Sequence, residues 1–427
     1  MNKERPGVKA VEQMLAGFQF VMTNQEKQQG KNSDYYFWQG LHSYYSKIHQ
    51  ANLAGTPLAG TGMFIPTEIL HAMEIPYLLE EYHGVLNCSA NPHGMEQFFE
   101  LAHGYGMGKE VCSPHRIAMG LALAHLAPSP TFILSTATTC DQTLKLYEVL
   151  SSYYKVPAFM VDSPFTTDER AIEYSKKEIR SLIKFVEEQS GKKMDYDKLK
   201  VVLQMSKQAT EYWESICGMR KQVPTPISSR DAIKDFGMLL TVGGTPEGID
   251  YFTARYAEVK ARYERKEGSI PEERYRIAWL YVLPLFDLGI ANWMEEEFGA
   301  AIVMDTFGYA NPAIQLDPSD PIDFLAKKPL KWGFISLCYG ALEYTDFDKK
   351  MAQQCIDYQA DAAIALAHWS CKQYCGTLKC IKDQIAATSG IPLLILDGDI
   401  CDPKVVSSAQ MKVKIKELFA MLEAQRG

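Results

Sequence analysis

Residues 131–162 read TFILSTATTCDQTLKLYEVLSSYYKVPAFMVD, and this stretch decides the fold class. Two short apolar runs, TFILST (131–136) and VPAFMVD (156–162), flank a helical pattern at 141–153. Apolar runs of this length predict buried strands, and the strand–helix–strand order predicts a parallel pair. We therefore predict a parallel sheet with helices on both faces.

The same alternation continues in both directions along the chain. TGMFI (61–65) and IPYLLE (75–80) predict two earlier strands, with helical patterns at 93–107 and 114–126. After a long charged and helical stretch, four more apolar runs predict strands at 276–284, 300–307, 361–369 and 391–399. The sequence thus predicts two similar α/β units.

A chain of 427 residues is too long for one ordinary core, so we expect several parts. The predicted fold class is α/β, with two doubly wound parallel-sheet domains, flavodoxin-like or Rossmann-like, that face each other across a cleft. The predicted parts are an N-terminal helical segment (1–50), a first α/β domain (51–166), a helical connecting segment (167–270) and a second α/β domain (271–427).

Charge and hydropathy exclude several classes of protein. The net charge is −8, from 44 basic and 52 acidic residues, which argues against a nucleic-acid binder. No apolar run reaches the roughly 18 residues that a membrane helix needs. The first residues also lack the apolar core of a secretory signal, so we expect a cytoplasmic protein. Ten cysteines in such a reducing compartment are not expected to form disulfides.

Three cysteines occupy similar topological positions. Cys140 follows the strand at 131–136, Cys371 follows the strand at 361–369, and both precede a helix, the second predicted near Gly376. Cys112 leads into SPHRIAMG, where Ser113 and Pro114 predict a helix start. Strand ends and helix N-termini form the ligand crevice of such sheets and stabilise thiolates. We therefore expect these cysteines to meet in the interdomain cleft.

Three cysteine ligands suit a [4Fe–4S] cluster with one iron left open, which can act as a Lewis acid. The alternative is that Cys112, Cys140 and Cys371 are ordinary core cysteines. Glu68, just after the strand at 61–65, is a candidate catalytic base; alternatively it stands in the first turn of a helix capped by Thr67.

Other patterns point to structure. Cys375 and Cys380 are predicted to be helix residues. His83, His93, His103 and His115 show no metal-binding spacing, and the glycines of GYGMGKE (104–110) form neither a P-loop nor a dinucleotide fingerprint. ATP hydrolysis by this chain is therefore not expected.

Several stretches resemble the subunits of 2-hydroxyacyl-CoA dehydratases, within the superfamily that also contains the cluster-bearing subunits of benzoyl-CoA reductase. They are HGYGMGKEVCSPHRIAMG, STATTCDQTLKLYEVL, PAFMVDSPFTT, HWSCKQ and the ending from GIPLLILDGDICDP, and the resemblance runs from about residue 60 to the C-terminus. It implies a heterodimer with a homologous sister subunit, each holding a [4Fe–4S] cluster through three cysteines. Here those positions match Cys112, Cys140 and Cys371.

The resemblance also implies a reaction. A separate ATP-dependent iron–sulfur activator injects one electron into an (R)-2-hydroxyacyl-CoA, the resulting ketyl radical loses its hydroxyl group, and an enoyl-CoA is released. Such a lyase handles an acyl-CoA substrate and belongs to anaerobic amino acid fermentation.

Three alternatives stay open at this point. The first is a subunit of an ATP-dependent benzoyl-CoA-type reductase, and the second is a non-catalytic electron-relay subunit. The third is a double-cubane-cluster reductase, which needs further cysteines. This chain has Gly62 and Met63 where one is expected and none in DTFGYANP, although Cys338 matches a third such position. Cys401 has no counterpart in this pattern.

Overall fold

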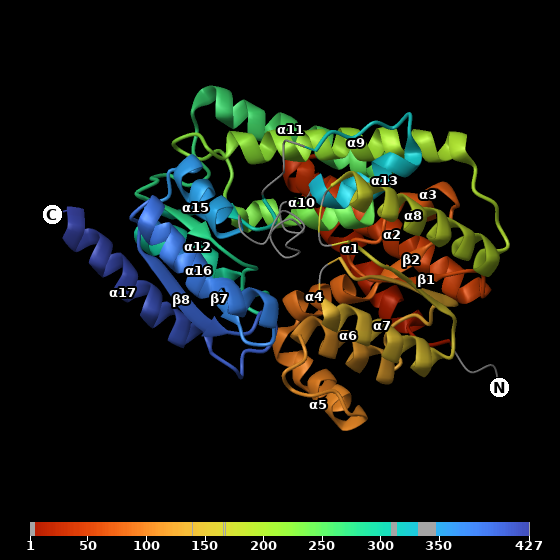
Figure 1. Cartoon of the computed structure of the whole chain (residues 1–427). Helices are drawn as coiled ribbons and strands as arrows, with labels where there is room; N and C mark the ends of the chain where they lie inside the picture. Colours follow the sequence, from red (N-terminus) through yellow and green to blue (C-terminus); the bar gives the residue numbers. More distant parts are fainter. Residues whose placement is uncertain are drawn as a thin grey trace.

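The computed structural model describes residues 5–138, 140–164, 166, 168–308, 314–331 and 347–426. They contain two four-stranded, all-parallel sheets (Figure 1). The first has the order β2-β1-β3-β4 and the second the order β6-β5-β7-β8. The strands are β1 (Ala59–Thr61), β2 (Tyr77–Leu79), β3 (Phe132–Thr136), β4 (Ala158–Val161), β5 (Tyr275–Trp279), β6 (Ala300–Asp305), β7 (Ala362–His368) and β8 (Leu393–Gly398). The predicted pair of doubly wound sheets is confirmed.

The two sheets share one winding pattern. In each, the chain passes from a central strand to one edge, then crosses to the other side of that strand. The direction therefore reverses between β1 and β3 in the first sheet, and between β5 and β7 in the second. Ligands bind beyond the carboxyl ends of strands at such reversal points. Both central pairs are fully buried, which explains their continuous apolar sequence.

Helices connect the strands of each sheet. In the first unit they are α3 (Glu68–Ala72), α4 (Glu80–Ala90), η1 (Pro92–Met95), α5 (Glu96–Tyr105), α6 (Ser113–Leu123) and α7 (Asp141–Tyr154). In the second they are α12 (Gly289–Phe298), α13 (Pro321–Lys331), α15 (Phe347–Asp357), α16 (Lys372–Thr388) and α17 (Ser408–Arg426). None of the helices in the described residues is long and apolar enough to cross a membrane.

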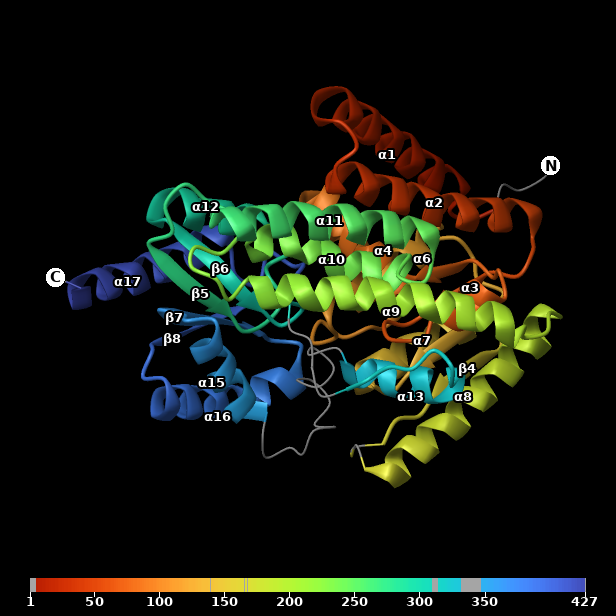
Figure 2. The same ribbon diagram turned by 90° about the horizontal axis from the view of Figure 1, so that it is seen from above.

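Two further groups of helices complete the molecule. The first is the antiparallel pair α1 (Val8–Gln29) and α2 (Ser33–Ala54), and the second comprises α8 (Glu169–Ser190), α9 (Tyr196–Met219), α10 (Ser229–Thr241) and α11 (Pro246–Arg265). Helix α2 packs against α11, and α13 of the second unit returns to pack against α8 and α9 (Figure 2). Helix α10 packs against strand β6, so the helical segment reaches the second sheet.

Three local boundaries differ from the prediction. Strand β1 ends at Thr61, and the turn that follows puts Phe64 in the left-handed region (φ 70°), so Met63 leaves the sheet. Helix α6 begins at Ser113 with Cys112 as its N-cap, so Pro114 is its second residue. Helix α16 begins at Lys372 rather than near Gly376. Helix α4 was not predicted, because its start, Glu80 and Glu81, is polar in sequence yet buried.

Candidate iron–sulfur site

Each of the three predicted cysteines is the N-cap residue of a helix. Cys112 precedes α6, Cys140 precedes α7 and Cys371 precedes α16, and no side-chain cap hydrogen bond is made by any of them. The first turn of a helix presents backbone N–H groups without helical partners and the positive end of its dipole. Each sulfur therefore lies beside a helix end that favours negative charge.

The three cysteines line one cavity of about 160 Å³ between the two sheet units. Cys112 and Cys140 come from the first unit and Cys371 from the second, as the topology predicted. Within the described residues, no three His, Cys, Asp or Glu side chains are close enough to hold a single metal ion. The thiols thus surround a space rather than one point, and thiolates are the usual ligands of iron–sulfur clusters. This donor set fits a cluster with one iron not held by these cysteines.

The protein environment keeps these thiols protonated until a cation displaces the proton. Burial raises the pKa of the Cys112 thiol well above its usual value, and the nearby Cys140, Cys371 and Asp399 raise it further. Burial also raises the pKa of Cys140 to about 11, although the Thr143 hydroxyl, 3.2 Å from its sulfur, acts in the opposite direction. Binding of iron to these sulfurs would therefore release protons.

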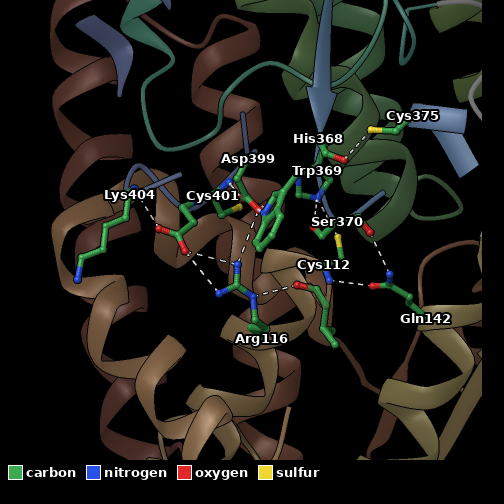
Figure 3. A network of polar contacts seen from close by, with 12 residues as sticks. Cys112, Arg116, Gln142, His368, Trp369, Ser370, Cys375, Asp399, Cys401 and Lys404 are labelled. Atoms are coloured by element: carbon green, nitrogen blue, oxygen red, sulfur yellow. Dashed lines mark hydrogen bonds and ion pairs between the residues drawn. The ribbon is translucent and has the colours of Figure 1, made fainter. Parts of the chain in front are cut away.

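The side chain of Gln142 joins all three cysteine-bearing loops. Its Oε1 accepts a hydrogen bond from the Cys112 N–H (2.8 Å), and its Nε2 donates to the Ser370 carbonyl (2.9 Å) (Figure 3). Gln142 stands two residues after Cys140, and Ser370 directly precedes Cys371. One amide therefore fixes the distance between loops from the two halves of the chain.

A second polar network reaches Cys112 from the second sheet. His368, at the end of β7, places Nε2 3.3 Å from the Cys112 sulfur and 2.9 Å from the Ser370 hydroxyl. Its Nδ1 is 3.4 Å from Asp399, which is 3.7 Å from the Arg116 guanidinium (Figure 3). Burial lowers the pKa of His368, although Asp399 raises it, so the imidazole is neutral and able to donate one hydrogen bond.

A buried carboxylate and a histidine also line the cavity. Glu81 Oε1 is 2.8 Å from His115 Nε2, and Glu81 Oε2 accepts a hydrogen bond from the Met63 N–H (2.8 Å). The hydroxyls of Thr143 and Tyr147 donate to the same carboxylate at 3.4 and 3.3 Å. These contacts fix Glu81 beside two of the cysteine-bearing helices, α6 and α7.

Glu68 does not line this cavity. Its carboxylate, on α3, forms an ion pair with Lys328 of α13 and accepts a hydrogen bond from the Ser206 hydroxyl of α9 (2.6 Å). Burial alone would raise the pKa of Glu68, but the charge and hydrogen bonds of Lys328, with Ser206, outweigh it and lower the pKa. This placement favours the structural role that the sequence left open, and the catalytic role of Glu68 stays a prediction.

The remaining cysteines do not line the cavity where they are described. Cys375 and Cys380 lie in α16, as predicted, and the Cys375 thiol donates to the His368 carbonyl (3.2 Å). Cys401 is buried, and its carbonyl accepts from the Cys88 thiol (3.6 Å). Cys338 lies outside the described residues.

The sequence did not reveal Gln142, His368 or Glu81 as site residues. Gln142 and His368 stand two and three residues from a predicted cysteine ligand, in TTCDQ and HWSC, and that proximity was the available signal. Glu81 gives no such signal, because it reaches the cavity only through the position of α4.

Comparisons with known proteins agree with this geometry. Residues 62–422 match the family model of the 2-hydroxyglutaryl-CoA dehydratase D-component. The alpha subunit of (R)-phenyllactyl-CoA dehydratase from Clostridium sporogenes is 24% identical over 379 residues, covering 84% of this chain and 88% of the relative. The alpha subunit of (R)-2-hydroxyisocaproyl-CoA dehydratase from Clostridioides difficile is 24% identical over 403 residues, covering 90% and 95%. A benzoyl-CoA reductase subunit from Thauera aromatica is 25% identical over 418 residues, covering 88% and 92%.

Proposed function

The chain belongs to the 2-hydroxyglutaryl-CoA dehydratase D-component family, and from this membership we propose that it is the [4Fe–4S] subunit of a 2-hydroxyacyl-CoA dehydratase. The proposed reaction is the elimination of water from an (R)-2-hydroxyacyl-CoA to give an enoyl-CoA, after one-electron activation. The proposed partners are a homologous sister subunit, consistent with the relatives' description as alpha subunits, and a separate ATP-dependent activator. The proposed location is the cytoplasm.

One observation carries the proposal: Cys112, Cys140 and Cys371 come from both halves of the chain and line one cavity as helix N-caps. When bound there, a [4Fe–4S] cluster would supply one-electron redox chemistry and a Lewis-acidic iron. The three helix ends would stabilise its negative charge. The Gln142 amide and the His368 imidazole would hold the Cys112 loop in place.

The protein also excludes water from this position. Tyr281, Leu285 and Ile400 line the cavity and are each less than a tenth exposed. A radical intermediate is quenched by competing proton and electron transfers, and a dry enclosure suppresses them. The Glu81–His115 pair is the nearest fixed proton-carrying group that lines the cavity in the described part of the chain.

A turnover assay tests the proposal. The complex of this chain with its sister subunit is supplied with reduced activator, ATP and an (R)-2-hydroxyacyl-CoA, and we expect the corresponding enoyl-CoA. Formation of a dienoyl-CoA from benzoyl-CoA, with no dehydration of any 2-hydroxyacyl-CoA, would instead identify a reductase subunit. Neither product, together with reversible reduction of the cluster, would identify an electron-relay subunit.

A further inference from the structure

The walls of the cysteine cavity differ in chemistry. Its polar lining residues stand at or near the N-termini of α4, α6, α7 and α16: the three cysteines with Glu81, His115, Thr143 and Gln373. Most of the remaining wall is hydrocarbon. It comes from α4, from α10, and from the segments that follow β5, β6 and β8. Cluster ligands need only the first group, so the apolar wall requires a separate explanation.

The apolar wall is rich in aromatic rings. Phe236 of α10 stacks on Phe307, with ring centroids 4.2 Å apart, and Tyr281 stacks on Tyr374 at 4.3 Å. Phe236, Phe307 and Tyr281 all line the cavity. Ile233, on the same helix as Phe236, also lines it and is half-buried. Such a surface favours contact with an aliphatic or aromatic group.

This wall has no positive charge. No lysine or arginine is among the described residues that line the cavity. The one carboxylate there, Glu81, is already bound by His115 and by the Met63 N–H. A ligand with a second carboxylate would be buried without a counter-charge and close to Glu81, which is strongly unfavourable.

We propose that the acyl group accepted at this site is uncharged and apolar, of branched-aliphatic or aryl size, and that dicarboxylic acyl groups are rejected. This inference rests on the proposed function, because it assigns the apolar wall to the acyl chain of a 2-hydroxyacyl-CoA. Ile233, Phe236 and Phe307 are then specificity-determining residues. A smaller acyl chain, such as lactoyl, leaves part of the wall uncovered and is used less well.

A substrate panel measures this preference with the holo complex. We expect kcat/KM for 2-hydroxyisocaproyl-CoA or phenyllactyl-CoA to exceed that for 2-hydroxyglutaryl-CoA by about 100-fold or more, and that for lactoyl-CoA by roughly tenfold. Equal or better use of 2-hydroxyglutaryl-CoA would overturn the inference. Calorimetric binding of the same thioesters to the complex gives a second readout. If no thioester is dehydrated, the proposed function fails, and the binding order still decides the acyl preference.

A charge-introducing variant tests the wall itself. Ile233→Arg places a cation on α10 at the cavity, and we expect the ratio of apolar to dicarboxylic substrate to fall at least tenfold. The control is Ile249→Arg, at an isoleucine of α11 that is also half-buried but does not line the cavity. The ratio should stay unchanged in the control. Because a ratio does not depend on how much protein is folded, an unchanged ratio in Ile233→Arg would contradict the assignment.

Discussion

At the scale of single residues, Gln142 has the widest influence for its size. Its amide bonds the Cys112 N–H and the Ser370 carbonyl, so three cysteine-bearing loops depend on one side chain. Gln142→Leu removes both bonds and should lower the free energy of unfolding by about 1–3 kcal/mol. It should also lower the iron retained per chain after anaerobic purification. Gln384→Leu, which removes only one bond within α16, should change neither quantity measurably.

The Glu68–Lys328 pair gives a second residue-scale prediction. Lys328→Met leaves the Glu68 carboxylate buried without a counter-ion, and we expect a loss of about 3–5 kcal/mol in chemical denaturation. The double variant Glu68→Gln/Lys328→Met should recover part of that loss, because no buried charge remains. A folded Glu68→Gln variant with kcat at least roughly 100-fold below wild type would instead establish Glu68 as a catalytic residue.

Glu80 should make stability fall as pH rises. Neither of its carboxylate oxygens has a hydrogen-bond partner among the described residues, and burial, with the adjacent Glu81, raises its pKa to about 8. The folded protein then keeps the Glu80 proton over a pH range in which the unfolded chain releases it. Between the usual glutamate pKa of about 4.3 and pH 7.5, this costs up to about 4 kcal/mol.

Thermal melts from pH 5 to pH 8 test this pH dependence. Glu80→Gln removes the titration, so we expect it to be more stable than wild type at pH 8 and close to wild type at pH 5. The exposed Glu100→Gln serves as the control and should follow the wild-type curve. A Glu80→Gln curve with the same slope as wild type would show that Glu80 is ionised in the folded protein.

At the scale of elements, the close approach of α5 and α6 sets one prediction. A Cβ atom at Gly120 of α6 would lie 2.3 Å from the Phe98 carbonyl oxygen of α5. Gly17, inside α1, has no such neighbour within 4 Å. Gly17→Ala should therefore stabilise the protein by up to about 1 kcal/mol, through helix propensity alone. Gly120→Ala should destabilise it by about 1–3 kcal/mol, because the two helices must separate. Melting temperatures that rise in both variants would contradict this packing.

The order of the elements could be predicted because parallel strands are buried on both faces. The runs that became β3, β6, β7 and β8 are apolar throughout, so their positions were correct within a few residues. The predicted strand at 61–65 was placed too late, because the apolar residues after Thr61 belong to a turn at the cavity. Helix α4 was missed because Glu80 and Glu81 are buried by tertiary contacts, which no local pattern records.

At the scale of the whole molecule, the cavity lies where the two sheet units meet. Arg116 of α6 pairs with Asp399 and Asp402 beyond β8, and the Ser89 hydroxyl donates to the Leu285 carbonyl. The convergence of three cysteines could be predicted, since each stands next to a helix start on one side of its sheet. The cross-unit partners could not, because Gln142, His368 and Glu81 are brought together only by the relative placement of the two sheets.

The central claim is that Cys112, Cys140 and Cys371 together hold one [4Fe–4S] cluster. It is tested most directly by anaerobic purification of the wild-type complex and of variants with each cysteine changed to serine, followed by iron and sulfide analysis of this chain. We predict about four irons and four sulfides per chain in wild type, and a large loss in each of the three variants. Cys375→Ser, a control in α16, should keep the full content. About eight irons per chain would indicate a double-cubane cluster, and full iron content in any of the three variants would contradict the ligand assignment.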